Sequence, residues 1–315
     1  MVVREGALLA LGSLSAALLA CGEPSEFHTG GGPGTDQPST CDHVTSVPDD
    51  VAERLALDRG FYAKHCAVFG IDVLGSAPVS DAAMLETGRI LEGMLADLKD
   101  VRDAMHDRYF RVVVVASSAG QDLRDVPELQ GLRRAENAAA GIGPDPAFPA
   151  ASLRDSAIVC RPPEQDPLAT PPGDTLVHEV AHAVLDMGLA PLDPDFRDRL
   201  RDAYRAARDD GRWTIDLPPA VAGLFGEQPI DNYLMTNADE YWATGVSAWL
   251  GYKPMPVAYG LTDDDPPLLA LEVIYGRDAF ESQDPDLAGL LTEVLGRSPA
   301  LRPSCTEWIP SFDLR

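Results

Sequence analysis

The chain has 315 residues, enough for one large domain or two smaller ones. Hydrophobic residues make up 45% of it and charged residues 24%, which is ordinary for a globular protein with a buried core. Acidic residues outnumber basic ones by 50 to 25, so the formal net charge is −25. A surface of that sign repels phosphate backbones, so we expect no nucleic acid among the partners and interpret the charge as a contribution to solubility.

The first twenty residues have the pattern of a targeting segment. One arginine in MVVREG is followed by the apolar and small residues ALLALGSLSAALLA and then by Cys21. The apolar run has the length of a signal-peptide core and is too short to span a bilayer comfortably. The stretch LLAC resembles a bacterial lipobox, so we expect residues 1–20 to be a lipoprotein signal peptide and Cys21 to be lipidated. An ordinary secretory signal is the alternative.

Export would place the protein in the bacterial cell envelope, anchored by lipid to the outer membrane or cell surface, or would release it as a secreted protein. That compartment is oxidising, so the remaining four cysteines can form two disulfides in any of three pairings. They are Cys41, Cys66, Cys160 and Cys305. None has CxxC spacing, which argues against a structural zinc site made of cysteines.

A flexible tether is predicted over residues 21–46, because Gly, Pro, Ser and Thr dominate residues 22–40 and cannot bury enough apolar surface to become ordered. From Val47 the composition becomes that of a globular domain. We predict one folded domain over 47–315, with an N-terminal lobe of about 47–135 and a second lobe of about 136–315.

Helical and strand patterns alternate along this domain. A short helix is predicted over 48–57, and a long one over 80–105 with Ser80 as its N-cap. The β-branched run FRVVVVASS, 110–118, predicts a buried strand, and SAIVC, 156–160, predicts a second, short one.

Four helices are predicted in the second half of the chain. Their ranges are 174–187 with Gly188 as a C-cap, 193–210, 237–250 with Asn237 as an N-cap, and 284–296. A majority of helices with a small sheet predicts the α+β fold class.

The helix over 174–187 carries an HExxH motif, with His178 and His182 four residues apart. Positions i and i+4 share one face of a helix, so both imidazoles can bind one metal ion. Glu179 is placed to take a proton from a metal-bound water. The alternative is a helix that carries two histidines without any metal.

A catalytic zinc ion needs a third protein ligand and one open position. The metzincin spacing would place another histidine where Gly188 stands, and no histidine follows His182. Glu240 is the better candidate, because it lies near the start of a helix of aromatic and small residues, and a buried carboxylate is costly unless it is paired or binds metal. The alternative is an acidic first-turn residue that the helix dipole favours.

Tyr233 precedes Glu240 by seven residues. A phenol at the rim of a zinc site can donate a hydrogen bond to a developing oxyanion. The spacing alone favours an ordinary core or surface tyrosine.

The stretches LVHEVAHAVLDMG and YLMTNADEYWATGVSAWL together resemble the gluzincin peptidases related to the catalytic domain of anthrax lethal factor. In that family the two motif histidines and a later Glu, in an E-(Y/F)-(W/F)-A context, bind zinc, and a Tyr seven residues before that Glu assists catalysis. The matching positions here are His178, His182, Glu240, Glu179 and Tyr233. The resemblance covers about residues 60–250, where upstream stretches are similar to uncharacterised secreted members of the group.

This resemblance implies a mostly helical, zincin-like metallopeptidase with an HExxH active-site helix and one Zn²⁺ per chain. It implies a peptide or protein substrate, cleaved by a zinc-bound water that Glu179 activates. We expect a monomer.

The pattern departs from the family at one position. Related gluzincins often carry a second carboxylate one turn after the ligand Glu, where this chain has Thr244. Metal-binding histidines usually need such an outer-shell acceptor, for which Asp186 and Asp239 are the candidates. Thr244 therefore keeps a second interpretation open, a catalytically degraded zinc-binding or interaction protein anchored to the cell envelope.

Overall fold

The computed structural model describes residues 41–130, 141–145, 148–159, 172–215, 230–261, 269–274 and 276–296, together with residue 301. The predicted signal peptide, the lipidation site Cys21 and the tether up to residue 40 lie outside these ranges, as do Cys160 and Cys305. None of the described helices combines the length and apolar character that crossing a bilayer requires.

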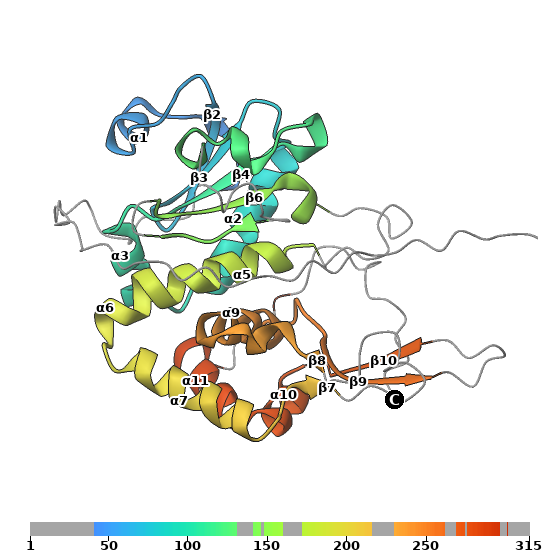
Figure 1. Cartoon of the computed structure of the whole chain (residues 1–315). Helices are drawn as coiled ribbons and strands as arrows, with labels where there is room; N and C mark the ends of the chain where they lie inside the picture. Colours follow the sequence, from blue (N-terminus) through green and yellow to red (C-terminus); the bar gives the residue numbers. More distant parts are fainter. Residues whose placement is uncertain are drawn as a thin grey trace, which may run out of the picture. The chain divides into compact units, whose positions relative to one another are not determined.

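Six strands form one mixed sheet in the order β1–β2–β3–β4–β6–β5 (Figure 1). β2 and β3 form an antiparallel hairpin, β3, β4 and β6 are parallel, and β5 returns antiparallel at the edge. The bounds are β1 (Thr45–Ser46), β2 (Tyr62–Val68), β3 (Ile71–Ser76), β4 (Arg111–Val115), β5 (Gly141–Ile142) and β6 (Ala150–Arg154). The hairpin turn consists of Phe69 and Gly70, which both have the positive φ that a two-residue type I′ turn needs.

Helices make up much of the remaining described chain. They are α1 (Asp49–Arg54), α2 (Asp81–Leu95), α3 (Lys99–His106), α5 (Asp174–Ala183), α6 (Ala190–Leu192), α7 (Phe196–Asp209), α9 (Ala238–Trp249), α10 (Arg277–Gln283) and α11 (Pro285–Leu295). Two small hairpins pair β7 (Thr214–Ile215) with β8 (Ile230–Asp231), and β9 (Met255–Leu261) with β10 (Leu269–Ile274). Helices around one principal sheet agree with the predicted α+β class.

Strand β4 separates two hydrophobic cores. Val112 and Val114 belong to the larger core, on the face that α2 and α5 cover, whereas Val113 and Val115 belong to the smaller core on the face of α1. Side chains alternate between the two faces of a strand, so this continuous run of valines fills both cores. The run therefore makes β4 a fully buried strand, as its β-branched composition predicted.

One predicted strand was too long and the other was wrong. β4 ends at Val115, and Ser117–Ala119 form the 3₁₀ turn η1. The described part of SAIVC contains no strand: residues 156–157 lie in the 3₁₀ turn η4 (Asp155–Ala157), and the strand of this region is β6, over 150–154. The reason is Asp155, whose buried carboxylate accepts hydrogen bonds from the Ser117 hydroxyl at 2.7 Å and the Ser118 amide at 3.1 Å, fixing turns at the ends of both strands.

The helix predicted over 80–105 is interrupted at 96–98, which separates α2 from α3. Its predicted N-cap is confirmed, since the Ser80 hydroxyl accepts a hydrogen bond from the amide of Ala83. The guanidinium of Arg102 on α3 donates to the carbonyls of Leu95 and Ala96, at 3.0 and 2.8 Å. Carbonyls at a helix end need such donors, so Arg102 allows α2 to stop there.

The predicted C-cap at Gly188 was wrong. The chain continues from α5 through a π-helical turn, η6 (Val184–Leu189), into α6. Gly188 lies inside that turn, and a Cβ atom there would collide with a Cγ of Val101 on α3. Glycine at this position permits close packing of two helices instead of ending one.

The part of the chain directly after the predicted tether residues 22–40 is held to the sheet. Cys41 and Cys66 form a disulfide, with their Cα atoms 4.8 Å apart, and this is one of the pairings left open by the sequence. Both cysteines are buried, and β1 pairs with β2. Residues 41–46 therefore belong to the fold, and β5 and β6, beyond residue 135, belong to the same sheet as β1–β4.

Candidate metal centre

The two histidines of the HExxH motif share one face of α5. Their imidazole centroids are 4.8 Å apart, and their Nε2 atoms are separated by 3.2 Å. Leu176, Val177 and Val180 are fully buried in the larger core, which fixes the orientation of the helix. The amphipathic pattern thus presents both imidazoles on the side of α5 that faces α9.

Glu240 reaches the same point from α9. Its Oε2 atom lies 3.0 Å from Nε2 of His178 and 3.7 Å from Nε2 of His182. The predicted N-cap explains its position, since the Asn237 side chain accepts hydrogen bonds from the amides of Asp239 and Glu240, each at 2.9 Å. The structure therefore brings together the three predicted ligands. Glu240 is 58 residues after His182 in the chain.

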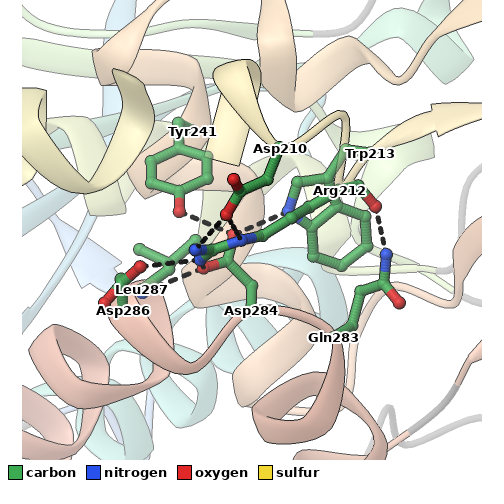
Figure 2. Close-up of polar contacts among 8 residues, drawn as sticks. All are labelled: Asp210, Arg212, Trp213, Tyr241, Gln283, Asp284, Asp286 and Leu287. Atoms are coloured by element: carbon green, nitrogen blue, oxygen red, sulfur yellow. Dashed lines mark hydrogen bonds and ion pairs between the residues drawn. The ribbon is translucent and has the colours of Figure 1, made fainter. Parts of the chain in front are cut away.

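Two buried contacts fix α9 against its neighbours. The indole of Trp242 donates to the carbonyl of Ala181 on α5 at 2.9 Å. On the side away from α5, the fully buried carboxylate of Asp284 accepts hydrogen bonds from Tyr241 on α9 at 2.6 Å and from the indole of Trp213 at 2.7 Å (Figure 2). It also caps α11, accepting from the amide of Leu287. Tyr241 and Trp242 directly follow Glu240, so both contacts position that ligand.

The guanidinium of Arg212 completes the Asp284 cluster. It lies 3.1 Å from Asp284 and also pairs with the exposed carboxylates of Asp210 and Asp286, each at 2.7 Å (Figure 2). These donors offset the cost of burying the Asp284 carboxylate. Sequence reasoning assigned Asp284 only to the start of a helix, because nothing in the local pattern shows that Trp213 and Tyr241 converge on it.

The chemistry of the three side chains fits a zinc ion. Two imidazoles and one carboxylate are a zinc-binding set, and their ligand atoms all lie within 4.8 Å of one another. Within the described part of the chain no other group of three such side chains comes together. Oε2 of Glu240 is buried and accepts no hydrogen bond in good geometry there. A buried polar atom without a partner is costly, and a cation between these residues would satisfy it.

The charges of the site are coupled. Burial raises the pKa of the Glu240 carboxyl, but the two adjacent imidazoles outweigh burial and hold that pKa far below its usual value. Burial lowers the pKa of the His182 imidazole, but Glu240 and Glu179 outweigh it and raise that pKa. For Glu179 burial dominates, so the pKa of its carboxyl is raised although both imidazoles oppose the change. The two glutamates therefore differ in proton affinity, with Glu179 the stronger base.

Two glycines, Gly141 and Gly143, form a glycine wall without side chains next to Glu179. A Cβ atom at Gly141, in the edge strand β5, would come within 3.1 Å of Oε1 of Glu179. A Cβ atom at Gly143 would lie 2.9 Å from Oε2 of the same carboxylate and 3.5 Å from the imidazole of His182. These two glycines were missed by sequence reasoning, and the alternation GIG directly before a proline was the available signal.

Tyr233 lies at the edge of the site. It begins the 3₁₀ turn η7 (Tyr233–Thr236), and its ring centroid is 6.1 Å from that of His178. The side chain is 56% exposed, so it is neither a core residue nor remote from the ligands. Burial of its inner edge and the charge of Glu240 raise the pKa of the phenol, which keeps it protonated and able to donate. The Nζ atom of Lys253 lies 5.8 Å from the ring centre.

Asp186 and Asp239, the predicted outer-shell acceptors, both pair with one arginine. Arg197, near the start of α7, contacts Asp186 of η6 and lies 3.2 Å from Asp239 of α9. Asp186 raises the pKa of His182 through its charge, so it influences that imidazole from a distance. The observed role of the two aspartates is to join the end of the motif helix to the first turn of α9 through Arg197.

Thr244 is fully buried one turn after Glu240. Its hydroxyl has no hydrogen-bond partner among the described residues, and neither does Nδ1 of His178. Positions i and i+4 share a helix face, so Thr244 lies on the face of α9 that carries Glu240. The imidazole of His178 therefore lacks the acceptor that outer-shell carboxylates supply elsewhere.

Comparison of the chain with protein-family models, with curated proteins and with solved structures found no match.

Proposed function

We propose that this protein is a zinc-dependent metallopeptidase. The observation that supports it is the convergence of His178, His182 and Glu240 from two helices, with Glu179 next to them. The resemblance of these segments to gluzincin peptidases favours the same function. Bound Zn²⁺ would lower the pKa of a water molecule and polarise a peptide carbonyl.

The chain's own residues have distinct roles in this proposal. Glu179 accepts the proton of the attacking water, for which its raised pKa suits it, and passes that proton to the leaving amine nitrogen. Tyr233 donates a hydrogen bond to the carbonyl oxygen as charge develops on it. An extended peptide can add to β5, which has no neighbour on its outer side among the described strands.

The decisive variant is Glu179→Gln, which keeps the size of the side chain and removes its basicity. We expect hydrolysis of a quenched-peptide library to fall by roughly 10²- to 10⁴-fold. Zinc should stay near one ion per chain by elemental analysis, because Glu179 is not among the proposed ligands. The exposed Glu92→Gln is the matched control and should retain full activity. Undiminished hydrolysis by Glu179→Gln would refute the mechanism.

A second candidate is a zinc-binding protein without catalytic activity. It is favoured by Thr244 and by the unpartnered Nδ1 of His178. The same experiment separates the two functions: wild-type protein that holds zinc and cleaves no member of the library is the second candidate.

A further inference from the structure

An open cavity of about 520 Å³ lies between α7 and the segment that leads into α9. None of the three proposed metal ligands lines it, although Asn237, which caps the helix that carries Glu240, does. The cavity is lined by Arg201, Tyr204, Arg205, Arg208, Asp209, Thr236, Asn237 and Ala238.

The charge of this cavity is opposite to that of the whole chain. Arginines 201, 205 and 208 recur at the spacing that places them on one face of α7. The helix as a whole carries five arginines and three aspartates, in a chain with a net charge of −25. The opposite face of α7 is apolar and buried, through Leu200, Ala203 and Ala207, so the arginine face is fixed toward the cavity.

The arginines are available to a ligand. Among the described residues, Arg201 and Arg205 pair only with exposed aspartates one turn away, at 2.9 and 3.3 Å. Exposed pairs of this kind are weak, so a ligand carboxylate can compete with them. Arg208 has no ion-pair partner within the described ranges of the chain. Asp209 is the one acidic residue that lines the cavity, so the lining keeps a positive balance.

A hydrogen bond and a ring contact from Tyr204 join α7 to the segment that leads into α9. The hydroxyl of Tyr204 donates to the carbonyl of Met235 at 2.9 Å, and its ring packs edge-on against Tyr241. Asn237 and Ala238 begin α9, and the Asn237 side chain already accepts hydrogen bonds from the amides of Asp239 and Glu240. The positive charge of the cavity therefore comes from the arginines of α7.

We propose that this cavity binds a short peptide segment with two neighbouring acidic side chains. Guanidinium groups match carboxylates in charge and geometry. The volume is that of a site for a ligand of several residues, larger than a single phosphate needs, and the arginine stems with Tyr204 supply apolar contact for a peptide backbone. A long polyanion is disfavoured, because the acidic remainder of the surface repels every charge outside the cavity.

Isothermal titration calorimetry with a capped Gly-Glu-Glu-Gly peptide tests this proposal. The protein is stripped of metal and dialysed free of chelator, so the measurement is independent of hydrolysis and of the proposed zinc site. We expect the Glu peptide to bind at least tenfold more tightly than Gly-Gln-Gln-Gly, and its affinity to fall as salt is raised. Equal affinity for the two peptides, or equally tight binding of inorganic phosphate, would overturn the proposal.

The matched variants change three charges each. Arg201→Gln/Arg205→Gln/Arg208→Gln should weaken binding of the Glu peptide at least tenfold. Arg59→Gln/Lys99→Gln/Arg124→Gln, at exposed positions outside the cavity, should stay within twofold of wild type. All six positions are exposed, so circular dichroism should show the same fold for both proteins. Equal binding by the two triple variants would assign the affinity to overall charge and not to this cavity.

Discussion

At the scale of single residues, the second ring nitrogen of His178 is the feature of the site that calls for a partner. Its Nδ1 atom and the hydroxyl of Thr244 are both buried and both lack partners among the described residues. A ligand imidazole binds metal best when its second nitrogen donates to an acceptor that fixes the ring. Thr244 supplies no negative charge for that purpose.

This gives a prediction for Thr244→Asp. A carboxylate at this position should accept from Nδ1 of His178 and tighten zinc binding by about tenfold, the lower end of the effect of such partners. Competition with a chromophoric chelator measures the change. Thr244→Val, which has the same shape and no acceptor, should stay near the wild-type affinity. If the two variants bind zinc equally well, Thr244 is not the missing partner position.

At the scale of elements, the candidate metal centre depends on how firmly α9 is held in place. Asp284 holds α9 through its hydrogen bond with Tyr241, on the side away from α5. Asp284→Asn keeps the shape but removes the charge that Arg212, Trp213 and Tyr241 share. We expect the free energy of unfolding to fall by about 3 kcal/mol, since the buried donors of Trp213 and Tyr241 then lose their charged acceptor. Urea denaturation measures this. The control Asp286→Asn removes an exposed partner of the same arginine and should cost less than about 1 kcal/mol.

The same elements show what the sequence could and could not predict. Periodicity located α7, α9 and α11 to within a few residues, and Asn237 was a local signal for the start of α9. Spacing within one helix predicted the histidine pair. The breaks at 96–98 and in η6 depend on Arg102 and Val101, which act through the folded structure.

Tertiary contacts also explain the parts of the site that were missed. Glu240 was predicted from the cost of a buried carboxylate, and the resemblance to gluzincins added weight to Glu240 and Tyr233, which no periodicity in the chain would have joined to His178. Gly141 and Gly143 matter only because β5 passes next to Glu179, and Arg197 only because η6 and α9 meet. Such residues become recognisable only after strand order and helix packing are known.

At the scale of the whole molecule, the Cys41–Cys66 disulfide joins the start of the described chain to the sheet across a separation of 25 residues. Replacing both cysteines by alanine should lower the free energy of unfolding by roughly 3 kcal/mol, because the unfolded chain gains the freedom of an open loop. Thermal unfolding of the double variant and the wild type under non-reducing conditions measures this. An unchanged midpoint would show that the bond adds nothing to stability.

The glycine wall beside Glu179 has a consequence for selectivity. Along that wall Gly141 and Gly143 can offer a bound chain only amide and carbonyl groups, which are common to every peptide. In the proposed peptidase, discrimination between one residue type and another would then come from side chains elsewhere at the site, such as Tyr233 and Lys253. A change of preference should therefore be sought by altering these two residues, since enlarging either glycine would displace Glu179.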